Sequence, residues 1–170
     1  MKKGLLTRFA VIMGAFCAFA FSQAGPSAPS SIPKGAAMHA TGAFEVTIKP
    51  ETTEDKSEGL PLGRMSINKQ FHGDLEGTSK GEMLTAGSGG VKGSGAYVAI
   101  ERVSGTLHGR SGTFILQHRG TMTRGATELT ITVVPDSGTG QLAGLAGKMD
   151  IKINEGKHSY DFEYTLAETP

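Results

Sequence analysis

The sequence predicts an all-β protein, because apolar and polar residues alternate along most of it and glycines separate the alternating stretches. A period of two places successive side chains on opposite faces of a strand. Alternation of this kind indicates an antiparallel sheet with one buried face and one wet face. No segment longer than a turn or two shows the spacing of an amphipathic helix, so we expect no substantial helix.

The alternating stretches follow one another with short, glycine-containing connections. They include Phe44–Ile48, Met65–His72, Leu129–Val133, Lys148–Ile153 and Ser159–Leu166. About eight such strands in succession suit either an up-and-down barrel or a sandwich. We favour a single closed antiparallel barrel with meander topology, because closure removes the exposed edges that an open sheet would leave. An acidic segment at 51–63 and a glycine-rich one at 86–96 are expected to be loops.

A weak internal repeat accounts for several glycines. The stretch "GTLHGRSGTFIL" at 105–116 aligns with "GQLAGLAGKMDI" at 140–151. Each copy is expected to contain a strand end, a tight turn and the start of the next strand, and glycine supplies the backbone freedom that such turns need. The repeat therefore explains these glycines without a ligand.

The chain begins with the features of a secretory signal peptide. Residues 1–24 contain a basic start, an apolar run from Phe9 to Phe21 and a small-residue cleavage site. Residues 25–38 are rich in Pro, Ser and Gly and are expected to form a disordered tether, so the barrel domain occupies 39–168. We expect an exported protein, periplasmic or secreted, without stable membrane insertion after cleavage. Its one cysteine, Cys17, leaves with the signal, so no disulfide is expected.

Charge and motifs exclude several function classes. The chain carries 17 basic and 16 acidic residues, and it becomes slightly acidic once the signal is removed, so nucleic acid is not an expected partner. The five histidines lack metal-ligand spacing, and neither a complete phosphate-binding loop nor a nucleophile elbow occurs. We therefore expect no metal and no cofactor.

The remaining signal is a set of polar residues in register with inward-facing apolar ones. Lys69 lies between Ile67 and Phe71, and His118 shares its parity with Leu116, so both are predicted to face into the barrel, whereas neighbouring Gln117 and Arg119 face out.

The strand at 96–103 is ambiguous, because either of its two faces could be buried. A buried lysine needs a carboxylate. That requirement favours the face that carries Tyr97 and Glu101, and it leaves Glu82 as the other candidate partner of Lys69.

These residues have two interpretations. They could form a structural network inside a filled barrel, or a pocket at one barrel mouth, with apolar walls and a few convergent polar groups. In the second case Lys69 or His118 would serve as acid or base, with Glu101 holding it in place. The candidate pocket residues are Lys69, Glu82, Tyr97, Glu101, His118 and Tyr164.

Three stretches, "GRMSINKQFHGDLEGTSKGEML", "YVAIERVSGTLHGRSGTFILQHRGTM" and "ITVVPDSGTGQLAGLAGKMDI", together with "GKHSYDFEYTL", resemble a bacterial family known as domain of unknown function 3224. The resemblance covers roughly Ala40 to Leu166. That family is similar in fold to the eight-stranded barrel of allene oxide cyclase, which is related to the plant dirigent proteins. The resemblance implies the fold more firmly than a function, and no catalytic residue of the cyclases matches a position here.

Three functions follow as hypotheses. The first is an exported barrel that binds a small hydrophobic molecule in its interior. The second is a cofactor-independent cyclase or isomerase acting on an unsaturated lipid-like or polyketide-like substrate, and the sequence leaves open whether the protein is an enzyme. The third is a non-catalytic structural module of the cell envelope, which would have a filled interior and an exposed apolar patch.

Overall fold

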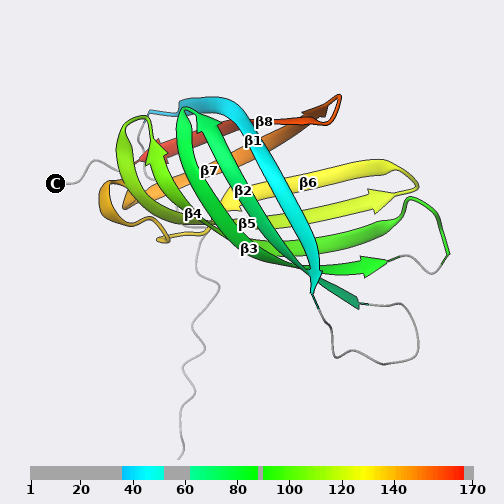
Figure 1. The fold of residues 1–170 in the computed structure, drawn as a ribbon. Helices are drawn as coiled ribbons and strands as arrows, with labels where there is room; N and C mark the ends of the chain where they lie inside the picture. Colours follow the sequence, from blue (N-terminus) through cyan, green and yellow to red (C-terminus); the bar gives the residue numbers. More distant parts are fainter. Residues whose placement is uncertain (1–35, 52–61, 88–89, 167–170) are drawn as a thin grey trace, which may run out of the picture. The chain divides into compact units, whose positions relative to one another are not determined.

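A computed structural model describes residues 36–51, 62–87 and 90–166 of the chain. These residues form one closed antiparallel barrel whose eight strands follow each other in chain order (Figure 1). The strands are β1 (Met38–Glu51), β2 (Leu62–Gly73), β3 (Leu75–Gly87), β4 (Gly95–Leu107), β5 (Arg110–Thr123), β6 (Ala126–Val133), β7 (Leu145–Asn154) and β8 (Lys157–Leu166). The predicted fold class and meander order are confirmed.

The predicted signal peptide and most of the predicted tether lie outside the described residues, as does most of the acidic loop. In the part of the chain that the structure describes, no helix is long and apolar enough to span a membrane. The one helical element there is a short 3-10 turn, η1 (Gly140–Leu142), in the connection between β6 and β7.

Tight two-residue turns join several of the strands. His108 and Gly109 have φ angles of 45° and 79°, and the pairs Arg124–Gly125 and Glu155–Gly156 also have positive φ at both positions. Positive φ at both central residues defines the hairpin turn whose twist matches that of the flanking strands. Glycine at the second position of each turn therefore fixes these hairpins.

The structure predicted from the internal repeat is confirmed for the first copy and wrong for the second. Its first copy is a strand end, a turn and the next strand, as expected, but its second copy begins in η1 instead of a strand. What the two copies share is local geometry, because Gly109 and Gly144 both have positive φ, and Leu107 and Leu142 are both buried.

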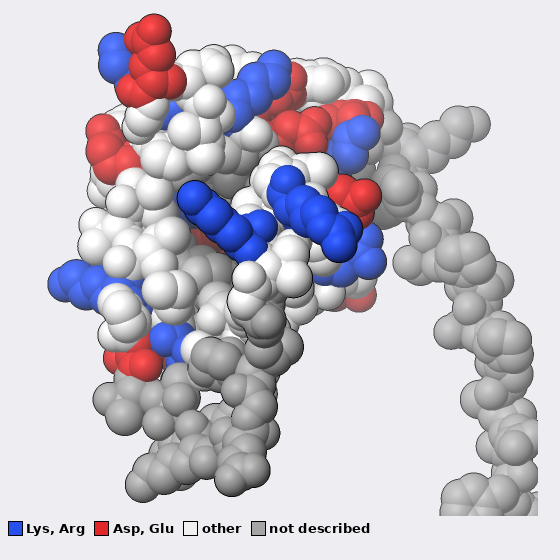
Figure 2. Space-filling model, turned by 90° about the vertical axis from the view of Figure 1, so that its right-hand side faces the viewer, with Lys and Arg blue, Asp and Glu red and all other residues white. Residues whose placement is uncertain are grey.

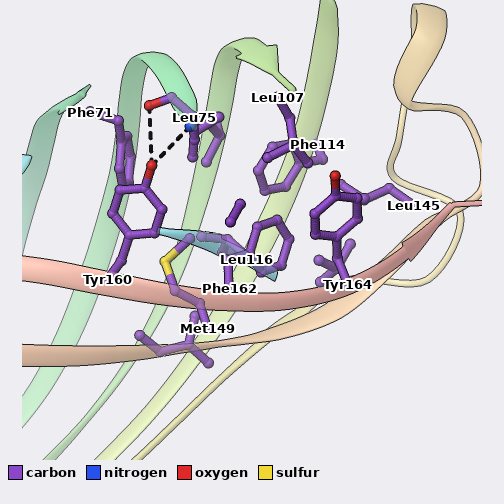
Figure 3. Packing of buried hydrophobic residues seen from close by; sticks show 14 of the residues in the cluster. Phe71, Leu75, Leu107, Phe114, Leu116, Leu145, Met149, Tyr160, Phe162 and Tyr164 are labelled. Atoms are coloured by element: carbon purple, nitrogen blue, oxygen red, sulfur yellow. Dashed lines mark hydrogen bonds between the residues drawn. The ribbon is translucent and has the colours of Figure 1, made fainter. Parts of the chain in front are cut away.

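The two ends of the barrel differ. The closed end contains the β2–β3 turn, the β4–β5 turn and the β6–β7 connection with η1. Its interior is filled by most of the buried apolar residues, among them Phe71, Phe114, Phe162 and Leu142. Figure 3 shows these rings and aliphatic side chains interlocking, with the Tyr160 hydroxyl accepting a 2.8 Å hydrogen bond from the backbone N–H of Leu75.

The open end carries the β3–β4 connection and the β5–β6 and β7–β8 turns, and the wall of the barrel is incomplete there. β4 and β5 pair along their whole length, from Leu107 opposite Arg110 to Gly95 opposite Met122. β6 and β7 share one register pair, Thr132 with Lys148, and then diverge (Figure 1). We call the space between the first half of β6 and the last half of β7 the slot.

Candidate functional site

A buried ion pair lies across the middle of the barrel. Lys69 projects inward from β2 and Glu101 from β4, and Lys69 Nζ donates a 2.7 Å hydrogen bond to Glu101 Oε2. Glu101 is completely buried, and Lys69 is 7% exposed. The prediction that the face of Glu101 points inward is confirmed.

Two further polar side chains complete this group, which we call the polar cluster (Lys69, Ser79, Glu101 and His118). Ser79, from β3, donates its hydroxyl hydrogen to Glu101 Oε1. His118 Nε2 lies 2.9 Å from Glu101 Oε2, but at an angle too poor for a regular hydrogen bond. The predicted inward orientation of His118 is confirmed, and so is the outward orientation of Gln117 and Arg119.

The polar cluster holds Glu101 in its ionised form. Burial by itself raises the pKa of Glu101, but the contact with His118, the positive charge of Lys69 and the hydrogen bonds from Lys69 and Ser79 outweigh burial and lower the pKa to about 2. Three partners on one carboxylate are the usual way in which a buried charge is accommodated.

The polar cluster separates two apolar layers. On the closed-end side, the Lys69 ammonium lies 5.1 Å from the centre of the Phe44 ring and 5.7 Å from that of Phe71, within range of cation–π attraction. On the other side is a small apolar layer of Ile67, Met83 and Ala99. The polar cluster is therefore part of the packed interior.

Two predicted site residues lie elsewhere. Glu82 faces outward and pairs with Arg64 at 2.6 Å, so the alternative pairing of Lys69 with Glu82 is wrong. Tyr164 faces inward as predicted, but at the closed end, where its hydroxyl lies 2.7 Å from His108 Nδ1. Its ring stacks on Phe162, so it is part of the closed-end core.

A pocket of about 580 Å³ opens at the other end, beside the slot. Its walls come from the ends of β3 to β7, and most of them are apolar. The lining residues are Ala86, Gly95, Ala96, Tyr97, Gly120, Thr121, Met122, Thr127, Glu128, Leu129, Ile151 and Ile153. Figure 2 faces this end of the barrel and shows a recess among uncharged atoms, with charged side chains around it.

Tyr97 is the predicted site residue that lines this pocket. It is half-buried on β4, directly opposite Gly120 on β5. A Cβ atom at position 120 would overlap the Tyr97 ring, so glycine there leaves the space that the ring occupies. Burial raises the pKa of Tyr97, and the negative charge of Glu101 raises it further.

The aliphatic lining was not predicted as a site. Met122, Leu129 and Ile153 have the inward parity of core residues, yet they are 39%, 41% and 63% exposed. Their one signal in the sequence is position, because all three lie close to strand ends beside the turns of the open end.

No group of three or more His, Cys, Asp or Glu side chains within the described ranges is arranged to hold a metal ion. The polar cluster has one carboxylate and one histidine, and a lysine already occupies the position beside them. Chemically, the site offers a largely apolar cavity with the phenol of Tyr97 and the carboxylate of Glu128 in its lining, above a neutralised ion pair.

Comparisons with known proteins agree with the barrel. Residues 40–164 match the profile of DUF3224, a family described as proteins of unknown function. A solved structure of a DUF3224 protein of unknown function from Shewanella oneidensis MR-1 is 47% identical, with a TM-score of 0.73, and the match covers 77% of this chain and 98% of that one. No curated protein matches the chain.

Proposed function

The chain belongs to the DUF3224 family, and we propose that this member binds a small hydrophobic molecule at the open end of its barrel. The observation that carries the proposal is the pocket of about 580 Å³ beside the slot. Small-molecule sites usually measure about 300–1,000 Å³ and combine apolar walls with a few polar groups. The size and lining of this pocket fit that description.

The exposed aliphatic side chains support a ligand. Leu129 and Ile153 are directed into the barrel by strand alternation, but they have no neighbouring strand to cover them across the slot. Apolar side chains that line a concavity gain free energy when a ligand removes their surface from water, by about 25 cal/mol for each Å² buried. The pocket therefore offers an apolar ligand a favourable surface that the fold leaves uncovered.

The polar cluster has a supporting role in this proposal. It lies beneath the apolar layer of Ile67, Met83 and Ala99 and keeps its charges paired. A ligand in the pocket thus meets Tyr97 and aliphatic side chains, while the buried charges hold the strands of the floor in place.

A dye-binding experiment tests the proposal. We expect Nile red, a neutral hydrophobic dye, to bind the barrel with increased fluorescence, and L129W to weaken that binding by about tenfold because the larger indole side chain occupies part of the pocket. L84W is the matched control, because Leu84 is also exposed but lies outside the pocket lining. Absence of dye binding, or equal binding by both variants, would refute a ligand site in this pocket.

The cyclase or isomerase alternative has less support. Glu101 is ionised and already engaged by three neighbours, and Lys69 is engaged by Glu101, so neither group is available to move a proton. General acid or base catalysis needs a group near the substrate with a pKa near the working pH. Among the described lining residues, Tyr97 and Glu128 carry ionisable side chains, and burial together with the charge of Glu101 moves the pKa of Tyr97 further above its ordinary value, which favours binding over catalysis by this phenol.

We also propose that the protein is exported, from the basic start, the apolar run and the small-residue site of residues 1–24. Intact-mass measurement of protein from its native host should give a mature chain that begins at or near Gly25. A chain that retains Met1 on most molecules would contradict export with cleavage.

A further inference from the structure

The three tyrosines of the chain differ in the hydrogen-bond partners of their hydroxyls. Tyr160 accepts a hydrogen bond from Leu75, and the Tyr164 hydroxyl is within hydrogen-bonding distance of His108. The Tyr97 hydroxyl, in contrast, has no hydrogen-bond partner in the part of the chain that the structure describes. It is not among the buried polar atoms that lack a partner in the described residues, so it is accessible to solvent and to a ligand. The side chain that lines the pocket is therefore the one whose hydroxyl is left unpaired.

The position of Tyr97 is specified by the sheet. β4 places it inward between Gly95 and Ala99, and Gly120 on β5 leaves the space for its ring. With the ring seated on a glycine and packed against Ile67, Met83 and Ala99, the side chain has little freedom to turn away. A fixed phenol is a suitable donor for a ligand, because little conformational entropy is lost on binding.

The composition of the pocket lining bears on the kind of ligand group that can meet this phenol. Glu128 is the one charged residue among the described lining residues, and none of them is basic. Glu101 acts on Tyr97 from below, and its negative charge opposes ionisation of the phenol. Because Lys69 neutralises Glu101, the charged lining group that a ligand meets is Glu128, and its negative charge disfavours a ligand carboxylate in the pocket.

We infer that the ligand is a neutral molecule with an apolar body and one hydrogen-bond-accepting oxygen, and that the Tyr97 hydroxyl donates to this oxygen. The inference rests on the proposed binding function and adds the chemical class of the ligand. Tyr97 is then the residue that separates a ketone, ester or ether from a plain hydrocarbon. The aliphatic walls supply affinity without distinguishing between them.

Three small aromatic compounds of similar size test the inference: acetophenone, which accepts a hydrogen bond, cumene, which does not, and benzoate, which is charged. Dissociation constants measured by NMR titration of the full chain are compared between wild type and Y97F. We expect Y97F to weaken the binding of acetophenone by about fivefold relative to that of cumene, which is the effect of losing one neutral hydrogen bond. Benzoate should bind wild type more weakly than acetophenone, and E128Q should narrow that difference.

The control is Y164F, which removes a tyrosine hydroxyl at the closed end. It should leave the ratio of the dissociation constants of acetophenone and cumene unchanged. An unchanged ratio in Y97F, or benzoate binding as tightly as acetophenone, would overturn the inference while the proposed binding function stands. If neither acetophenone nor cumene binds wild type, the binding function itself fails. G120A provides a second variant. Its added Cβ should displace the Tyr97 ring and weaken the binding of acetophenone relative to that of cumene, as Y97F does.

Discussion

The two ends of this barrel are built from the same strands and the same alternation, yet one is packed and the other is open. At the closed end Phe162 lies between Phe114 and Tyr164, with ring centres 5.8 Å and 5.3 Å apart. At the open end Ile153, also of inward parity, is 63% exposed. Alternation thus decides which way a side chain points, whereas burial depends on whether neighbouring strands continue past it.

The difference in packing between the two ends is tested most directly by removing one apolar side chain from each. Phe162→Ala should lower the free energy of unfolding by about 3–5 kcal/mol, because it leaves a cavity among packed rings. Ile153→Ala should change it by less than about 1 kcal/mol, because solvent already reaches this side chain. Urea unfolding of both variants checks the ranking, and equal losses would mean that the open end is as well packed as the closed end.

The polar cluster between the two ends can be tested by unpairing it. Lys69→Met should cost about 3–5 kcal/mol, since the Glu101 carboxylate stays buried without its main counter-charge. The double variant with Glu101→Gln should recover part of that loss. His118→Phe should cost less than Lys69→Met, because the ring shape is roughly kept.

Lys148→Met is the matched control for a surface lysine, because Lys148 pairs with Glu163 in solvent. It should cost less than about 1 kcal/mol. Thermal and urea unfolding measure all four variants. A harmless Lys69→Met would place the lysine in water and remove the ion pair from the interior.

Acid should weaken the polar cluster in a defined pH range. The pKa of Glu101 falls from its ordinary value of 4.5 to about 2 in the folded barrel, so the unfolded chain takes up this proton more readily. The stability that ionised Glu101 contributes is complete above pH 4.5 and is lost as the pH falls towards 2, by up to about 3 kcal/mol. Unfolding free energies measured between pH 6 and 3 should fall less steeply in Lys69→Met/Glu101→Gln. Parallel slopes would contradict a lowered pKa.

The smallest effects come from removing tyrosine hydroxyls at the two ends. Tyr160→Phe should cost about 1–3 kcal/mol, because the buried N–H of Leu75 loses its acceptor. Tyr97→Phe should change stability by less than about 0.5 kcal/mol, because its hydroxyl has no partner in the described part of the chain. Thermal unfolding of the two variants distinguishes them, and a large loss in Tyr97→Phe would show that its hydroxyl is structural.

Much of the polar cluster could be predicted from the sequence. Lys69 and His118 each lie between apolar residues of the same parity, and the need of a buried lysine for a carboxylate selects the face of Glu101. Glu82 could not be excluded, because the inward positions of β3 include Gly77, Ser79 and Gly81, which give no apolar alternation to read. The glycine at 81 has a role of its own, since a side chain there would press on the backbone of Glu101.

The pocket could not be predicted, because alternation does not show where along the barrel axis an inward-facing side chain lies. Tyr97 and Tyr164 both point inward, and only the strand register places the first at the open end and the second at the closed end. The slot depends on the divergence of β6 from β7 after a single register pair, which is a property of the assembled sheet. Local sequence therefore identified the inward residues of most strands and left their grouping to the tertiary structure.

The slot also bears on the self-association of the protein. Strand edges without a neighbour are where separate chains add to one another and aggregate. The slot has exposed charges on both edges, beside which an incoming strand would have to lie: Glu128 on one, and Asp150 and Lys152 on the other. These charges therefore disfavour the addition of a strand from another copy at the slot.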